Sequence, residues 1–196
     1  MPRFSESEKE EIRQKLLNEG EKLFAAYGIK KVTIDDLIKA VSIAKASFYT
    51  FYESKEYLYM DIVQGIQQRI FAELELLLEN NAALSDKERV KQVFAAMGEC
   101  MAHFPILAQI DSTTIDIISR RVSKERMTDY YRNNFDAVQS MCNHGIRFSC
   151  DVKIVSLVYQ SIYRSWIGLQ EASAEEQTAV TDILINGAID RMVINS

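Results

Sequence analysis

Apolar side chains recur every three or four positions along almost the whole chain, which is the spacing of amphipathic helices. The clearest stripe consists of Leu58, Ile62, Ile66, Ile70, Leu74 and Leu77. It predicts one long helix over residues 54–80, which at ~1.5 Å per residue would measure roughly 40 Å. No stretch of the sequence approaches the ~18 uncharged apolar residues that a membrane span needs.

Capping motifs divide the chain into about nine helices. A serine followed three residues later by glutamate begins helices at Ser7, Ser85 and Ser173, because the two residues satisfy each other's free backbone N–H groups. Thr33 and Asp36 form a related pair. The expected helices cover residues 7–28, 34–40, 44–50, 54–80, 85–103, 106–119, 123–148, 152–170 and 174–195.

Glycine and proline are scarce, with 7 and 2 residues among 196. A sheet protein of this size needs many tight turns, and tight turns draw on both residue types. The composition therefore favours an all-α fold, and a hydrophobic share of 47% is sufficient for a packed core. The N-terminus carries no apolar signal segment and the cysteine count of 3 is odd, so we expect free thiols in a cytoplasmic protein.

The last two expected helices are apolar on more than one side. Side chains within residues 152–170 and 174–195 cover more than the single stripe that one core requires. One face of each helix is therefore expected to meet a second copy of the chain, which predicts a homodimer formed through these helices. The alternative is that both helices are fully enclosed in the core of one chain.

A first helix ending at Gly28 is followed by a short helix, a three-residue turn and a second short helix between Thr33 and Thr50. Helices this short must pack on their neighbours, because helix nucleation is costly. The residues expected to face outward on the second short helix are Lys45, Ala46, Ser47, Tyr49 and Thr50. Small side chains let a backbone approach a surface, and hydroxyls beside lysine suit phosphates, so the pattern is typical of a DNA-reading helix-turn-helix.

The segment from residue 23 to residue 59 reads LFAAYGIKKVTIDDLIKAVSIAKASFYTFYESKEYLY. It resembles the tetracycline-repressor (TetR) family of bacterial transcription regulators almost position by position. The matching positions are Leu23, Phe24, Gly28, Thr33, Ile34, Asp35, Asp36, Leu37, Ala40, Lys45, Phe48, Tyr49, Phe51, Tyr52, Ser54, Lys55 and Glu56. The resemblance covers about residues 10–60. It implies an all-α fold with a helix-turn-helix DNA-binding domain over residues 1–53 and a helical bundle for ligand binding and dimerisation over residues 54–196.

The same resemblance implies that eight residues contact DNA. They are Thr33, Ala44, Lys45, Ala46, Ser47, Tyr49, Thr50 and Lys55. Two positions depart from the family pattern: Ser42 stands where a turn glycine is usual, and Ala44 stands where a serine often caps the reading helix. For Tyr49 the alternative is a core aromatic, and for Thr33 it is a purely capping role.

A small-molecule pocket among the C-terminal helices is also implied by the resemblance, and such pockets are mostly apolar with a few placed polar groups. The candidate lining residues are Met101, His103, Phe104, Gln109, Tyr130, Met141, His144, Tyr159, Tyr163 and Trp166. The implied function is a homodimeric regulator, most simply a repressor. It would bind a palindromic operator in double-stranded DNA and be released by a small apolar effector.

The overall charge does not by itself favour DNA as a partner. The chain carries a formal net charge of -5, and residues 1–60 hold ten basic and ten acidic side chains. An alternative is therefore a helical small-molecule-binding or adaptor protein that does not bind DNA.

Motifs of enzymatic chemistry are absent from the sequence: it has no phosphate-binding glycine loop, no serine nucleophile elbow and no HExxH. Glu99 with His103 offers too few ligands for a metal, and Cys142 and His144 point to different faces of a helix that Cys150 follows. We therefore expect no enzymatic activity, no cofactor and no metal. A small helical enzyme is the remaining alternative.

Overall fold

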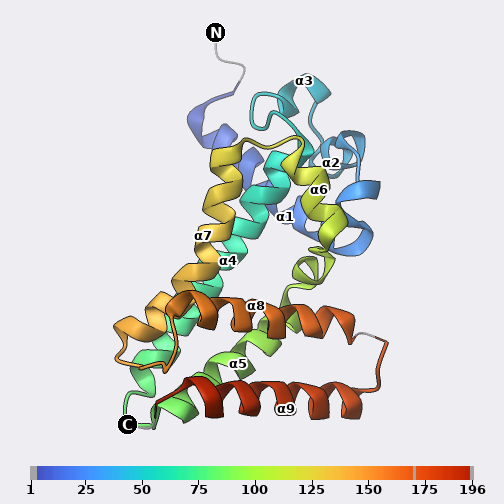
Figure 1. Cartoon of the computed structure of the whole chain (residues 1–196). Helices are drawn as coiled ribbons and strands as arrows, with labels where there is room; N and C mark the ends of the chain where they lie inside the picture. The colour runs from blue at the N-terminus through green and yellow to red at the C-terminus, as the bar shows by residue number, and fades with distance from the viewer. Residues whose placement is uncertain (1–3, 170, 195–196) are drawn as a thin grey trace. The chain divides into compact units, whose positions relative to one another are not determined.

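The computed structural model describes residues 4–169 and 171–194, apart from the side chains of residues 101, 131–137 and 167. Within this part of the chain there are nine α-helices and one 3₁₀ helix (Figure 1), so the expected all-α fold is confirmed. None of the described helices is both long and apolar enough to cross a membrane. The elements are α1 (Glu6–Lys31), α2 (Ile34–Val41), α3 (Lys45–Phe48), α4 (Lys55–Asn80), α5 (Asp86–His103), η1 (Pro105–Gln109), α6 (Ser112–Ser119), α7 (Lys124–Asn143), α8 (Val152–Gly168) and α9 (Ala174–Met192).

The chain divides into two compact units. Residues up to Gln67 together with Phe104–Tyr130 form the first unit, and Gln68–His103 together with the residues from 131 onward form the second. The helices α4 and α7 each contribute to both units. The family resemblance instead separates a DNA-binding domain from a ligand-binding domain between residues 53 and 54. That boundary is one of function, and it remains a prediction.

The core of the first unit is built from α1, α2, α3 and the beginning of α4. Phe24, Leu37 and Phe48 are almost completely buried in it, and the ring of Phe24 meets the ring of Tyr59 edge-on with centroids 5.2 Å apart. Gly28, at φ 73°, breaks α1 near the expected position, and the chain then makes one further turn before Val32 leaves it. Only glycine adopts this backbone conformation without strain.

The second unit packs the end of α4, α5, the end of α7, α8 and α9 around one core, and α8 and α9 lie side by side (Figure 1). The buried members of this core are Leu74, Leu78, Val90, Val93, Phe94, Met97, Val138, Met141, Ile146, Val155, Tyr159, Ile162, Ile185, Ile189, Met192 and Val193. Helical spacing places all of them except Ile146 and Val193, which lie outside the helices, on the inward face of a helix.

Helix caps follow the sequence motifs with one exception. The pairs that begin at Thr33, Ser85 and Ser173 each form the expected reciprocal bonds. The capping box predicted at Ser7 and Glu10 is wrong by two residues, because Ser5 and Glu8 cap α1 instead. The two motifs overlap in the sequence, and the earlier one lengthens the helix and so adds backbone hydrogen bonds.

Two expected helices end differently in the structure. Residues 106–119 are divided into η1 and α6, because the Asp111 carboxylate accepts a hydrogen bond from the Thr114 backbone at 2.7 Å and begins a new helix. The helix expected to reach residue 148 ends at Asn143. Gly145 turns the chain at φ 83°, and Phe148 then forms an isolated antiparallel bridge with Val193.

A buried arginine joins three segments of the second unit. Arg89 is 5% exposed, and its guanidinium donates to the carbonyl oxygen of His144 at 3.0 Å and to that of Leu78 at 3.3 Å. The Asp86 carboxylate lies 3.7 Å from the same group. Arg89 thus connects the start of α5 to the end of α4 and to the residue that follows α7.

We expect Arg89→Met to lower the free energy of unfolding by about 3–5 kcal/mol, because it leaves Asp86 and two carbonyl oxygens buried without their partner. Chemical denaturation followed by circular dichroism measures the loss. The control is Arg120→Ala, which removes an exposed i,i+4 pair with Asp116 and should change stability by less than ~0.5 kcal/mol. Equal effects of the two variants would contradict this role for Arg89.

Candidate nucleic-acid interface

The helix-turn-helix segment, which we define as residues 33–50, contains α2, a tight turn and α3. Ser42 ends α2 in the left-handed conformation at φ 56° and ψ 45°. Its backbone N–H and that of Ile43 bond back to carbonyls of α2, the latter to Ile38 at 3.1 Å. The turn therefore needs the conformation that glycine adopts most easily, and here a serine adopts it.

The start of α2 is held by a complete capping box. The Thr33 hydroxyl accepts from the Asp36 backbone, and the Asp36 carboxylate accepts from the Thr33 backbone N–H at 2.8 Å and from its hydroxyl at 2.7 Å. These bonds from Thr33 lower the pKa of Asp36 below its usual range. Thr33 therefore has the capping role, and its hydroxyl proton is already engaged by Asp36.

The α3 helix is a single turn of four residues. Ala44 stands at its N-cap position and offers no side-chain hydrogen bond, as its departure from the family pattern predicts. Phe48 is completely buried, and its ring contacts Tyr49 with centroids 5.7 Å apart and Tyr52 with centroids 6.1 Å apart. The burial of Phe48 holds the turn against the first unit and leaves its opposite side in solvent.

Most of the predicted contact residues lie on that exposed side. Ala44, Lys45, Ala46 and Thr50 are exposed, and Tyr49 is 52% exposed, which excludes the core role for this tyrosine. Lys45 is not isolated: its ammonium group lies 2.9 Å from the Asp35 carboxylate, and this hydrogen bond raises the pKa of Lys45.

Two predicted contact residues are placed differently from the expectation. Ser47 is only 3% exposed and directly precedes the completely buried Phe48 in a helix of one turn. It lines a hollow of about 520 Å³ whose wall also includes Phe4, Arg13 and Phe51. Ser47 therefore does not face outward, and its carbonyl oxygen accepts the hydroxyl proton of the exposed Thr50.

Lys55, at the first position of α4, has its ammonium group turned inward. The Lys55 Nζ atom donates to the carbonyl oxygen of Ile29 at 2.7 Å and to that of Val32 at 2.6 Å. These carbonyls end α1 and precede the cap of α2, so the geometry gives Lys55 a role in holding α1 and α4 together. In this arrangement the Lys55 ammonium group faces backbone carbonyls of its own chain, whereas the expected phosphate contact needs it to face solvent.

Asp61 on α4 forms a second connection within the first unit. Its carboxylate binds Arg13 of α1 at 3.1 Å and also pairs with Arg126 in the first turns of α7. The Arg13 guanidinium lies 5.8 Å from the ring centroid of Tyr52, and burial raises the pKa of the Tyr52 hydroxyl to about 12. The segment that follows α3 is thereby fixed to α1, α4 and α7.

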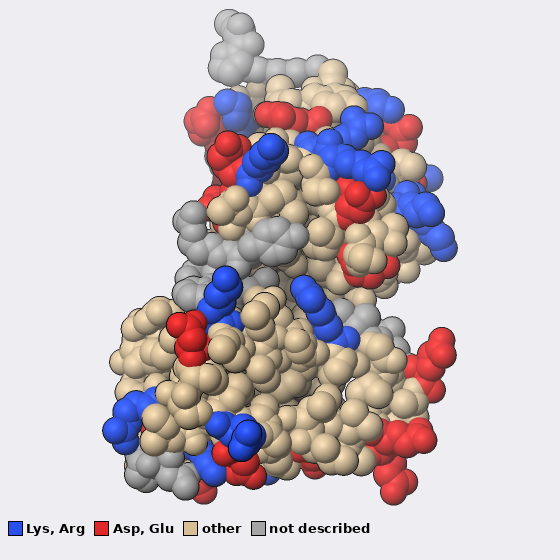
Figure 2. Space-filling model, in the orientation of Figure 1, with Lys and Arg blue, Asp and Glu red and all other residues tan. Residues whose placement is uncertain are grey.

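Three exposed lysines within or just before the helix-turn-helix segment had no place in the predicted contact set. Lys30 and Lys31 lie in the last turn of α1, and Lys39 lies in the last turn of α2. Figure 2 shows Lys and Arg side chains on the side of this unit where α2 lies. The sequence signal was available, since the three lysines flank the capping box of α2, but the equal number of acidic residues in the first 60 positions obscured it.

The residues of the predicted ligand pocket are divided between the two units. Met141, Tyr159, Tyr163 and Trp166 belong to the core of the second unit, where the Trp166 indole N–H donates to Thr181 at 2.9 Å. Phe104, Gln109 and Tyr130 belong to the first unit, His103 is exposed, and His144 lies beside a glutamate. The side chain of Met101 lies outside the described residues. The pocket remains a prediction.

The three cysteines form no disulfide. Burial raises the pKa of the Cys100 thiol, and Glu73 and Glu99 raise it further. Burial also raises the pKa of Cys142. Both thiols are therefore held in the protonated form, which is the less reactive one.

Comparison with known proteins agrees with this geometry. Residues 16–62 match the sequence model of the bacterial regulatory proteins of the tetR family. No curated protein sequence matches the chain closely enough to add to this comparison.

Solved structures match nearly the whole chain. A TetR-family regulator from Mesorhizobium loti has 12% identity and a TM-score of 0.65, covering 97% of this chain and 100% of its own. The fatty acid degradation regulator FadR from Bacillus halodurans has 14% identity and a TM-score of 0.65 over 90% of this chain and 94% of its own. The Stenotrophomonas maltophilia repressor SmeT has 16% identity and a TM-score of 0.59 over 93% of this chain and 90% of its own.

The first unit carries a helix-turn-helix of the kind found in DNA-binding transcription regulators. Residues 16–62 match the model of the tetR family, and solved structures of TetR-family regulators share the fold of this chain. The resemblance drawn from the sequence is thus confirmed.

The left-handed conformation of Ser42 predicts backbone strain in the turn, and this strain can be tested by mutation. We expect Ser42→Gly to raise the free energy of unfolding by about 0.5–1 kcal/mol, because glycine removes a left-handed strain of ~1–2 kcal/mol and loses part of the gain to its greater chain entropy. Thermal unfolding measures the change. Ser42→Ala keeps the strain and is the matched control; an equal gain in both variants would show that the hydroxyl, not the backbone, was unfavourable.

Proposed function

We propose that the protein is a homodimeric repressor that binds a palindromic operator through α3 and releases it when a small apolar molecule binds the second unit. The observation that carries the proposal is the exposure of Lys45, Ala46 and Tyr49 on a turn whose other side is anchored by the buried Phe48. Lysine donates to guanine or phosphate, and an alanine methyl meets a thymine methyl. A one-turn helix with this surface suits the major groove.

The operator backbone would be contacted around the edges of that surface. Tyr49 and Thr50 directly follow α3, which we call the reading turn, and the exposed Lys30, Lys31 and Lys39 lie in the last turns of α1 and α2. These side chains provide the sequence-independent part of the affinity, which arises from release of counterions by neutralised phosphates. Lys45 reaches DNA only by exchanging its bond with Asp35 for one to a base or a phosphate.

Dimerisation is supported by an apolar face that one chain leaves in solvent. On α8, Ile154 and Leu157 are 51% and 54% exposed. On α9, Val180, Ile183 and Leu184 are 37%, 72% and 39% exposed, although the opposite faces of both helices are buried. Figure 2 shows mainly uncharged side chains over these helices. Full enclosure of the two helices within one chain is thereby contradicted, and a second copy presenting the same face would cover them.

An apolar effector is supported by the character of the second unit and by the proteins that share its fold. The expected pocket residues Tyr159 and Trp166 each combine a large apolar surface with one polar atom, the pattern of small-molecule sites. The Tyr159 hydroxyl is neutral near pH 7, and burial raises its pKa further. Two of the similar solved structures are a regulator of fatty acid degradation and the repressor of a multidrug efflux pump.

Release of DNA would pass through α4, which begins directly after the DNA-binding domain proposed for residues 1–53 and continues into the second unit. A ligand that favours one tilt of this helix changes the spacing of the two reading turns in a dimer. Coupling of ~1–3 kcal/mol between effector and DNA is typical of such regulators and suffices for a large change in operator occupancy.

The competing function is a helical ligand-binding or adaptor protein without DNA binding. It is favoured by the equal numbers of basic and acidic residues in the first 60 positions. Selection of bound duplexes from a randomised pool separates the two. A palindrome with half-sites about one DNA turn apart, roughly 34 Å, supports the regulator. No enrichment from an intact dimer supports the adaptor.

With the selected operator, we expect Lys45→Ala to weaken binding about tenfold. It should also reduce the slope of the logarithm of the binding constant against the logarithm of the salt concentration by about one per subunit. Tyr49→Phe should weaken binding by less, because only a hydroxyl is removed. Fluorescence anisotropy at several salt concentrations measures both effects. The control is Lys22→Ala, which removes an exposed lysine paired with Glu19 on α1 and should bind as the unaltered protein does. Unchanged binding by the Lys45 and Tyr49 variants would show that α3 is not the reading helix.

For the dimer we expect Ile183→Glu to produce a folded monomer, because a charge would be buried at the centre of the proposed contact. Light scattering after size-exclusion chromatography measures the mass. Leu76→Glu is the control, since Leu76 is 58% exposed but lies on α4. A monomeric unaltered protein, or a dimer that survives the Ile183 change, would refute the proposed interface.

A further inference from the structure

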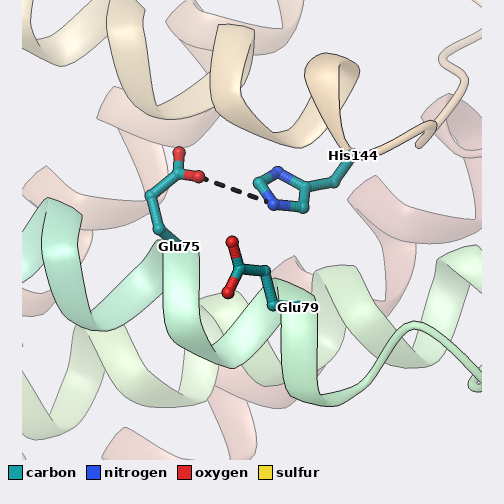
Figure 3. Close-up of side chains that lie close together, drawn as sticks. All are labelled: Glu75, Glu79 and His144. Atoms are coloured by element: carbon teal, nitrogen blue, oxygen red, sulfur yellow. Dashed lines mark ion pairs between the residues drawn. The ribbon is translucent and has the colours of Figure 1, made fainter.

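Three side chains with metal-binding atoms converge in the second unit. Glu75 and Glu79 lie one turn apart on α4, and His144 follows the end of α7 (Figure 3). One ligand atom of each residue lies within 4.8 Å of the others. Ligand atoms bound to one ion at ~2.1 Å lie roughly 3–3.5 Å apart, so small side-chain rotations bring all three to one ion.

The imidazole of His144 is oriented as a ligand. Its Nδ1 atom lies 3.0 Å from the Ser140 carbonyl oxygen, which can only accept, so Nδ1 carries the proton of that bond. The other ring nitrogen, Nε2, then points toward Glu75 and lies 3.5 Å from its Oε2 atom. Metal-binding histidines commonly have this arrangement, with one ring N–H fixed by a backbone carbonyl and the other nitrogen directed at the ion.

The carboxylate of Glu75 is also oriented from outside the cluster. The Ser140 hydroxyl donates to its Oε1 atom and leaves Oε2 facing the imidazole. The side chains of Glu75 and His144 are 47% and 19% exposed, so the group is partly shielded and still open to solvent. One serine on α7 thus positions both a carboxylate and an imidazole.

The electrostatics of the group require a cation or a second proton. A neutral imidazole with its proton on Nδ1 directs a lone pair from Nε2 toward Glu75, and Glu79 brings a second negative charge to the same point. This arrangement is repulsive unless Nε2 is protonated or a cation lies between the three groups. A divalent ion would neutralise both carboxylates at once and use the Nε2 lone pair.

We infer that Glu75, Glu79 and His144 bind one divalent transition-metal ion of the zinc type. One imidazole nitrogen and two carboxylate oxygens suit Zn²⁺ and its neighbours, with water completing the coordination. The imidazole disfavours Mg²⁺ and Ca²⁺, which prefer oxygen ligands alone. The lack of a thiolate among the three disfavours Cu⁺. The inference departs from the expectation that this chain holds no metal, and it does not rest on the proposed function.

The bound ion would connect α4 to the end of α7 within the second unit. Glu79 and Glu75 precede His144 by 65 and 69 positions in the chain, and all three would bind the same ion. An ion that binds the folded chain and not the unfolded one raises the unfolding temperature in proportion to the logarithm of its concentration. The site would therefore act first on the stability of the second unit.

The test is titration of the chelator-treated full chain with zinc chloride, followed by calorimetry and by thermal unfolding. We expect one zinc ion per chain and a rise in unfolding temperature that magnesium chloride does not produce. Glu79→Gln should weaken zinc binding at least tenfold without changing the fold, because Glu79 is exposed. His144→Gln should weaken it as strongly while leaving the backbone carbonyl that binds Arg89.

Matched controls keep the result specific. Glu73→Gln alters another exposed carboxylate of α4, and His103→Gln removes the other histidine of the chain; both should bind zinc as the unaltered protein does. Zinc that fails to raise the unfolding temperature, or binds equally to the Glu79 variant, would reduce the group to an ion pair of His144 and Glu75. Loss of binding in either control would place the ion elsewhere and overturn the assignment. If the His144 variant does not fold, the Glu79 variant alone decides.

Discussion

The position of the helix-turn-helix segment depends on one ammonium group. Lys55 donates to the carbonyl oxygens of Ile29 and Val32, and so joins the start of α4 to the end of α1 at the point where α2 begins. The helices between these points have 8 and 4 residues and cannot persist alone in water. Their entry and their exit are therefore fixed by the same side chain, and the burial of Phe48 sets their rotation.

Asp61 extends this arrangement along α4. Its carboxylate holds Arg13 of α1 and Arg126 of α7, beside the tyrosine that closes the aromatic contacts of Phe48. The first turns of α7 are thus tied to the same part of α4 that binds α1. The later turns of α7 belong to the second unit, so both α4 and α7 run from one unit to the other.

Local sequence signals predicted what local physics determines. The caps at Thr33, Ser85 and Ser173, the left-handed turn at Ser42 and the second apolar face of α9 were all predictable, because each depends on residues close in sequence. The burial of Ser47 was not, since a single helical turn has no periodicity that separates inside from outside. Neither the inward bonds of Lys55 nor the meeting of Glu75 with His144 could be predicted, because the partners are brought together only by the tertiary fold.

In the proposed function, the ion pair between Lys45 and Asp35 has a consequence for how the protein would search a chromosome. A reading turn whose only lysine is already neutralised by a neighbour gains little when it meets arbitrary phosphates, since one charge pair is merely exchanged for another. In the proposed function, Lys45 then adds little to residence on random DNA, which is left to exposed lysines such as Lys30, Lys31 and Lys39. Asp35 would in this way trade some affinity for a larger free fraction of regulator, available to occupy its operator.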